Sequence, residues 1–129
     1  MHFFWGSFDL AVTRFSGRRA PQHPGGVPNL PDAVTRESYS HEVSSCGFWP
    51  GGGPVPTPLY YSYAYPEPAG FMIATVQPGS AVYSPDLREF VLPDAHVRQA
   101  AAPDPAPLKL PPSTPDAAAN RGLCARRCR

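Results

Sequence analysis

Residues able to do acid–base chemistry gather in the stretch YSHEVSSCGFWPGGG, which runs from Tyr39 to Gly53. It contains adjacent His41 and Glu42, a thiol, two large aromatic rings and three consecutive glycines. The alternation of residue types predicts a strand over Tyr39–Phe48, because three serines in so short a run compete with helical hydrogen bonds. Neighbouring residues of a strand point to opposite faces, so His41 and Glu42 are not expected to act together on one substrate.

A catalytic dyad therefore needs a carboxylate from a second strand, and Asp9 is the candidate. Asp9 lies on the polar side of an alternating stretch, His2–Phe15, that predicts a strand with one apolar face. His41 with Asp9 could serve as a general base. The alternative, which we favour, is that His41 donates a hydrogen bond inside an aromatic core. The candidate catalytic residues are thus His41, Asp9 and Glu42, and whether the protein is an enzyme stays open.

Aromatic side chains offer a candidate ligand surface. The sequence LYYSYAY predicts a strand over Leu59–Tyr65 that carries tyrosines on both faces. The hydroxyls and rings of Tyr61 and Tyr63, with Trp49, could line a pocket. Core and cross-strand packing explains these rings equally well.

Signatures of metals and cofactors are missing from the sequence. Its four histidines and three cysteines show none of the spacings HExxH, HxH or CxxC. The triple glycine Gly51–Gly53 lacks the lysine and the following helix of a phosphate loop. Cys124 and Cys128 stand in an arginine-rich end, which a solvated terminus explains. We therefore expect no metal and no cofactor.

Composition narrows the classes of partner and divides the chain. A formal net charge of +1 gives no long-range attraction to nucleic acid or to an anionic membrane. An odd number of cysteines, three, favours reduced thiols and a cytoplasmic location. No apolar stretch reaches the roughly 18 residues that a membrane span requires. Every aromatic residue lies before residue 91, so we expect a partial β-rich domain over residues 1–101 and a disordered Pro/Ala/Arg-rich tail over residues 102–129.

The remaining pattern predicts an α+β fold, mainly antiparallel β-sheet with one or two short helices. No internal repeat is apparent in the sequence. The other expected elements follow from turn and capping residues. They are a turn-rich connector over Ser16–Pro31, a short helix over Asp32–Ser38 with Asp32 as its N-cap, a loop over Pro50–Pro58 that joins two strands into a hairpin, a further strand over Phe71–Val76, a hairpin of Ala81–Ser84 and Glu89–Leu92 around the turn Ser84-Pro85-Asp86, and a short helix over Asp94–Ala101.

Four distinctive sequence strings lie between His2 and Pro93. They are HFFWGSFDLAVTRFSGR (His2–Arg18), YSHEVSSCGFWPGG (Tyr39–Gly52), YSYAYPEP (Tyr61–Pro68) and YSPDLREFVLP (Tyr83–Pro93). Together they resemble the bacterial domain-of-unknown-function family 5996 (DUF 5996), C-terminal half only, over residues 2 to about 100. The resemblance implies no established activity, cofactor or substrate.

The resemblance also implies that this chain differs from other members of the family at both of its ends. The family has a β-rich N-terminal half and closes with an amphipathic helix, which Pro111, Pro112 and Pro115 forbid here. We therefore expect a truncated or frame-disturbed product. Phe3 and Trp5, which interrupt the polar side of the first strand, would then face the missing N-terminal half or a partner subunit.

Two functions are consistent with these observations. The first is an uncharacterised soluble protein, a fragment of a larger one, that binds or processes a small molecule at the candidate residues. The second is a non-enzymatic structural or protein-interaction module that uses Phe3 and Trp5. We expect the first.

Overall fold

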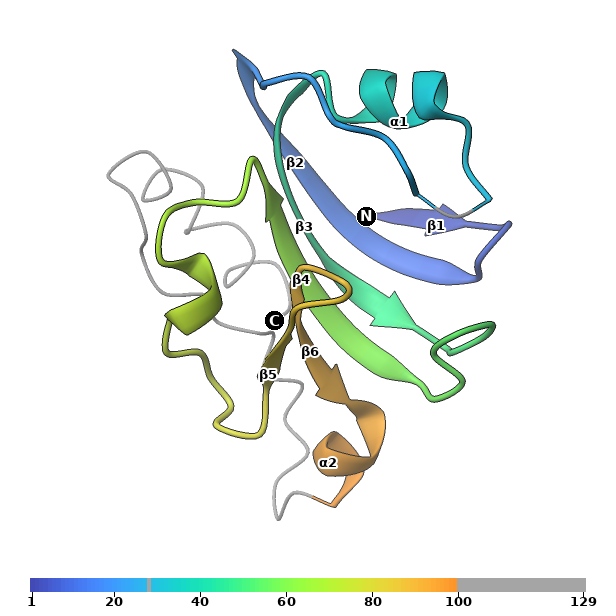
Figure 1. The fold of residues 1–129 in the computed structure, drawn as a ribbon. Helices are drawn as coiled ribbons and strands as arrows, with labels where there is room; N and C mark the ends of the chain where they lie inside the picture. Colours follow the sequence, from blue (N-terminus) through green and yellow to red (C-terminus); the bar gives the residue numbers. More distant parts are fainter. Residues whose placement is uncertain (28, 100–129) are drawn as a thin grey trace.

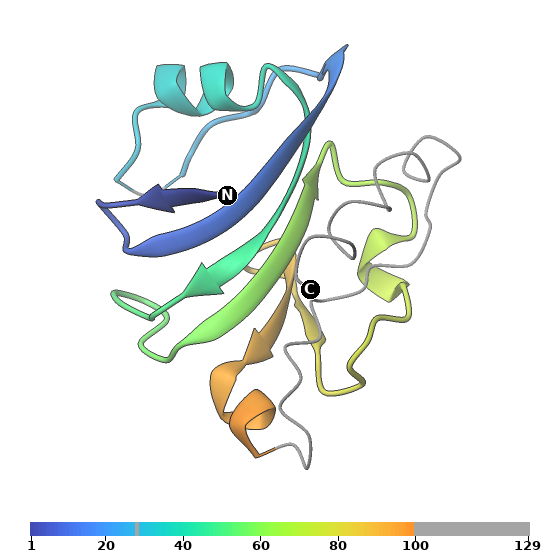
Figure 2. The ribbon, with the colours of Figure 1, turned by 180° about the vertical axis from the view of Figure 1, so that it is seen from behind.

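The computed structural model describes residues 1–27 and 29–99, which form one antiparallel six-stranded sheet with two short α-helices and a 3₁₀ helix. The strands are β1 (His2–Phe4), β2 (Asp9–Arg19), β3 (His41–Trp49), β4 (Leu59–Tyr65), β5 (Val82–Ser84) and β6 (Glu89–Pro93), in the order β1-β2-β3-β4-β6-β5. The helices are α1 (Asp32–Ser38), α2 (Asp94–Arg98) and the 3₁₀ helix η1 (Phe71–Ile73). Figures 1 and 2 show α1 and η1 on opposite sides of the sheet. The predicted α+β fold is confirmed, whereas the predicted tail lies outside the described residues.

The first predicted strand, His2–Phe15, is wrong, because the chain turns between Phe4 and Asp9. Phe4 pairs with Asp9 and Phe3 pairs with Leu10, so β1 and β2 form a hairpin. Across this four-residue turn the even and odd positions exchange faces, but Phe4, Phe8, Leu10 and Val12 all fall on even positions, which is why the sequence pattern looked continuous. The hairpin places Phe4 on the same face as Asp9 and not, as expected, on that of Leu10.

The connector between β2 and β3 begins later than predicted. Strand β2 continues to Arg19 through a register shift at Gly17, whose φ of 83° favours glycine.

Helix α1 has the predicted bounds, but Pro31 occupies the N-cap and not Asp32. The first turn has no side-chain cap, and the Asp32 carboxylate accepts a hydrogen bond from the Gly26 N–H at 2.9 Å.

The central hairpin confirms its prediction. β3 and β4 pair from Val43–Tyr65 to Trp49–Leu59 across the proline-rich loop. β5 and β6 form the second predicted hairpin. The strand predicted over Phe71–Val76 is wrong: Gly70, with φ 77°, leads the chain into η1. The last predicted helix is shorter, Asp94–Arg98.

The two edge hairpins, β1–β2 and β5–β6, have the same geometry. Each pair of one hairpin recurs in the other with the residue numbers raised by 80, from Phe3–Leu10 to Tyr83–Phe90. Phe8 and Arg88, the last residues of the two turns, both have positive φ, 54° and 57°. The structure thus contains a repeat that the sequence did not reveal, and the sheet has an approximate two-fold axis between β3 and β4.

The pairing register defines two faces of the sheet. Face A carries the row Ala11, Gly47, Tyr61, Val91, and face B carries the row Leu10, Phe48, Tyr60, Leu92. A small core on face A joins Ala11, Leu59 and Tyr61, with Trp49, Val55, Tyr63 and Val91 packed around it.

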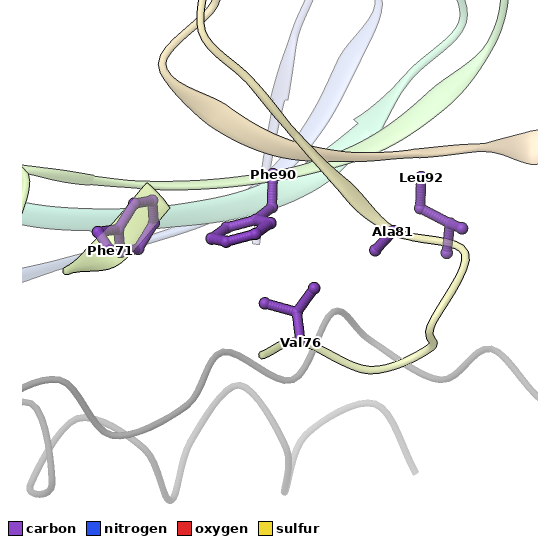
Figure 3. Packing of buried hydrophobic residues seen from close by; sticks show 5 residues of the cluster. All are labelled: Phe71, Val76, Ala81, Phe90 and Leu92. Atoms are coloured by element: carbon purple, nitrogen blue, oxygen red, sulfur yellow. The ribbon is translucent and has the colours of Figure 1, made fainter. Parts of the chain in front are cut away.

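The larger core lies on face B, under the segment that carries η1. Phe90 and Leu92 project from β6 toward Val76 and Ala81, with Phe71 beside Phe90 (Figure 3). This core covers only the β4–β6–β5 half of the face. Within residues 1–27 and 29–99, no helix is long and apolar enough to cross a membrane.

Candidate functional site

Asp9 and Tyr61 form the central contact of face A. Asp9 starts β2, and the Tyr61 hydroxyl donates to both of its carboxylate oxygens, at 3.0 and 2.9 Å. Burial raises the pKa of Asp9, and the hydrogen bond from Tyr61 partly offsets this. Burial, the hydrogen bond to Asp9 and the Asp9 charge together raise the pKa of Tyr61, so its phenol stays protonated and remains the donor.

Gly47 makes this contact possible. Tyr61 belongs to β4 and Asp9 to β2, so the tyrosine ring has to cross β3, which lies between them. A Cβ at position 47 would lie 2.7 Å from the Tyr61 hydroxyl and 2.8 Å from its ring, and closer still to the Leu10 carbonyl oxygen. Only a residue without a side chain leaves room for the ring there.

Glu89 brings a second carboxyl group to the same face. It starts β6 and occupies the position in the β5–β6 hairpin that Asp9 occupies in the β1–β2 hairpin. Burial, the larger cause, and the Asp9 charge together raise the pKa of Glu89 to about 7. The Glu89 charge in turn contributes to the raised pKa of Tyr61. The approximate two-fold axis thus places two carboxyl groups around one tyrosine; we call Asp9, Tyr61 and Glu89 the acidic–tyrosine site.

Hydroxyl groups continue the polar network along β3 and β4. The Tyr63 ring stacks on Tyr61 with 6.2 Å between centroids, and its hydroxyl accepts a hydrogen bond from Tyr39 at 3.3 Å. Buried Ser45 hydrogen-bonds to Thr13 at 2.9 Å and lowers the pKa of both Tyr61 and Tyr63. Burial, the larger effect, still leaves the pKa of Tyr63 raised. These groups hold the two rings in place beside the carboxylates.

The expected dyad of Asp9 and His41 is not formed. Asp9 precedes Leu10, which pairs with Phe48, whereas His41 pairs with Arg19 at the other end of β2. Seven residues of strand separate Phe48 from His41, which corresponds to about 23 Å. The Nδ1 atom of His41 lies 3.2 Å from the Ser40 hydroxyl. The antiparallel register of β2 and β3 places Asp9 and His41 at opposite ends of β2, and the sequence alone does not give this register.

Glu42 and Trp49 lie apart from one another. Glu42 points to face B, where it accepts hydrogen bonds from Arg18 and Ser16, both at 2.8 Å, and these bonds lower its pKa. Trp49 ends β3 and packs against the face A core beside Tyr61. Of the predicted residues, the structure therefore brings together Asp9, Tyr61, Tyr63 and Trp49, and it leaves out His41 and Glu42.

Sequence reasoning missed Glu89 and Gly47. The signal for Glu89 was present in the strings HFFWGSFDLAV and VYSPDLREFVL, which align when their numbers differ by 80 and place Asp9 opposite Glu89. The signal for Gly47 was a single glycine inside a strand, which often marks a close approach of another group. Among the described residues, no group of three or more His, Cys, Asp or Glu could hold a metal ion.

No curated protein and no solved structure matches this chain significantly. The sequence model of a family of unknown function (DUF5996) matches residues 1–127, which extends beyond the residues 2 to about 100 of the expected resemblance. The chain therefore belongs to the DUF5996 family.

Proposed function

We propose that the protein binds a small molecule that carries a protonated amine, at the acidic–tyrosine site of face A. Asp9 and Glu89 would bind the positive charge. The rings of Tyr61, Tyr63 and Trp49 would contact the remainder of the molecule, since aromatic faces attract cations. Glu89, whose pKa lies near 7, is also suited to accept or donate a proton at neutral pH.

One observation carries this proposal: in the part of the chain that the structure describes, the two carboxyl groups have no basic partner. Within residues 1–27 and 29–99, no hydrogen bond or ion pair joins Asp9 or Glu89 to a lysine, arginine or histidine, and their mutual repulsion contributes to the raised pKa of Glu89. Arg18 pairs with Glu42 on face B at 2.7 Å, and the pairs Arg36–Asp32 and Arg98–Asp94 lie within α1 and α2. A cation placed between Asp9 and Glu89 would relieve this repulsion.

The test is a titration of ¹⁵N-labelled protein with a set of primary amines, followed by chemical shifts at pH 8. The matched alcohols and carboxylic acids of the same carbon skeletons serve as comparison ligands. We expect the amines alone to shift the backbone signals of Asp9, Gly47, Tyr61 and Glu89. The variants Asp9→Asn and Glu89→Gln should each abolish these shifts.

Glu42→Gln is the matched control, because Glu42 is a strand carboxylate on the opposite face with its own arginine partner. This variant should bind amines like the unmodified protein. Amine-induced shifts that are absent, or that survive both Asp9→Asn and Glu89→Gln, would show that the site does not bind such molecules.

A second candidate function is a non-enzymatic protein-interaction module, and the exposed rings of the β1–β2 hairpin favour it. Phe3, Trp5 and Phe8 contact one another edge to face, with centroids 5.0 to 6.1 Å apart. All three are exposed, and so is Leu10 beside them. An apolar patch of this kind is typical of a protein contact.

Three finer expectations stay part of the proposal. They are that the chain corresponds to the C-terminal half of the family's fold, that the protein comes from a bacterium and that it acts in the cytoplasm. The uncovered β1–β2 hairpin supports the first, and the three cysteines support the last. Supplying the N-terminal half in trans and finding no complex would contradict the first.

A further inference from the structure

The aromatic hairpin surface, defined by Phe3, Trp5, Phe8 and Leu10, lies open on one half of face B. Leu10 is 40% exposed and Trp5 is 77% exposed. At the matching position of the other hairpin, Phe90 is 2% exposed. Since the two hairpins share their register and turn geometry, this difference comes from what packs against them and not from the strands.

The residues that cover the β5–β6 hairpin belong to the segment just before it. Phe71 lies edge-on to both Tyr83 and Phe90, with centroids 6.2 and 5.2 Å away. Val76 and Ala81 complete the contact with Leu92 in the same buried cluster (Figure 3). Tyr83, Phe90 and Leu92 correspond by register to Phe3, Leu10 and Val12.

We propose that the aromatic hairpin surface binds an apolar polypeptide segment of a partner, seated as residues 66–81 are seated on the β5–β6 hairpin. One large ring of that segment would contact Phe3 and Leu10, as Phe71 contacts Tyr83 and Phe90. A β-branched side chain would cover Val12, as Val76 covers the other end of its cluster. Trp5 and Phe8 would border the contact.

The size of the surface favours a segment over a second copy of the chain. An aromatic side chain buries about 150–250 Å² in full, so covering three partly exposed rings and a leucine removes roughly 400 Å² from this chain. A stable protein–protein interface needs about 800 Å² from each partner. The turn also carries no charged side chain from Phe3 to Phe8, so the segment needs to be apolar and not charged.

The test is to tether a second copy of residues 66–81 before Met1 through a flexible Gly/Ser linker, since the original segment runs directly into β5. A short flexible linker gives a local concentration in the millimolar range. We expect amide exchange in β1 to slow by about tenfold or more and the indole N–H of Trp5 to gain protection. The matched control carries Phe71→Ser and Val76→Ser in the added copy only and should give neither effect.

Three results would overturn the proposal. The first is equal exchange in the two tethered proteins and the untethered chain. The second is an untethered chain that sediments as a dimer with Trp5 protected and that Leu10→Ser converts to a monomer, since the surface would then join two copies. The third is an untethered monomer with Trp5 already protected, since the chain would then cover this surface itself.

Discussion

The two edge hairpins of the sheet share one backbone and differ in their surroundings. The β5–β6 hairpin holds Phe90 and Leu92 in the main core, whereas the β1–β2 hairpin leaves Phe3 and Leu10 exposed. Their turns, WGSF and PDLR, have no sequence in common, yet both end on a residue with positive φ. Turn length and strand pairing therefore determine the hairpin, and the neighbouring segment determines how much each hairpin stabilises the protein.

The same comparison separates the two carboxyl groups. Asp9 and Glu89 occupy equivalent positions, but only Asp9 receives a hydrogen bond from Tyr61. Glu89 has the more strongly raised pKa, which fits the absence of a hydrogen-bond donor to its carboxyl group among residues 1–27 and 29–99. Near-symmetry of the backbone thus produces two acids of different strength, a common basis for acid–base sites.

The largest expected effect is on the free energy of unfolding, when the buried ring of Phe90 in the β5–β6 hairpin is removed. Phe90→Ala should lower the free energy of unfolding by about 3–5 kcal/mol, because it leaves a cavity under Phe71. Leu10→Ala, the equivalent change in the exposed hairpin, should cost about 1 kcal/mol or less. Urea denaturation of both variants measures the difference, and equal losses would show that the β1–β2 hairpin is as well packed as the other.

A second prediction uses the pKa of Glu89. Burial and, to a smaller extent, the Asp9 charge raise this pKa from 4.5 to about 7, so the folded protein holds the proton more tightly than the unfolded chain does. The stabilisation is complete below pH 4.5 and is lost as the pH rises to 7, by at most about 3 kcal/mol. Glu89→Gln should flatten the stability in this range and make the variant more stable than the unmodified protein at pH 8.

Urea denaturation at several pH values provides this measurement. Glu42→Gln is the control and should keep the loss of stability between pH 4.5 and 7. A Glu89→Gln variant with the same pH dependence as the unmodified protein would place the titrating group elsewhere.

The third prediction concerns Gly47, which faces Tyr61 across the approximate two-fold axis. Gly47→Ala should displace the Tyr61 ring and lower the free energy of unfolding by about 1–3 kcal/mol, the usual cost of overpacking. Gly6→Ala, where a Cβ would meet no atom within 4 Å, should change it by about 0.5 kcal/mol or less. Similar losses in both variants would mean that Tyr61 does not lie over Gly47.

The smallest effect makes the two carboxyl groups more alike. Tyr61→Phe removes the hydrogen bond that offsets part of the burial of Asp9, so the pKa of Asp9 should rise. Carboxyl carbon chemical shifts against pH measure this change. An unchanged midpoint for Asp9 would show that the hydrogen bond is absent in solution.

The sequence predicted the fold where its signals were local. The strand Leu59–Tyr65 was confirmed at both ends, because proline-rich loops flank a dense run of β-forming side chains. The turn Ser84-Pro85-Asp86 was equally visible. The turn between Phe4 and Asp9 was not, since Trp5 and Phe8 are apolar and Phe4, Phe8 and Leu10 all fall on even positions although the faces exchange at the turn.

The candidate site was only partly predictable for a different reason. Asp9, Tyr61, Tyr63 and Trp49 were selected by residue type, but their arrangement depends on which ring crosses which strand. Tyr61 crosses β3 at Gly47, and neither residue shows this in the sequence. Glu89 can be selected only from the equivalence of two hairpins that lie 80 residues apart. The pairing of their backbones shows this equivalence more clearly than their side chains do.

The titration of Glu89 tests the acidic–tyrosine site most directly. Carboxyl carbon NMR should give Glu89 a midpoint near pH 7, and Asp9→Asn should lower that midpoint because the neighbouring charge is removed. Glu42→Gln should leave it unchanged. A midpoint near 4.5 that does not respond to Asp9→Asn would contradict the site, since the two carboxyl groups would then be solvated and independent.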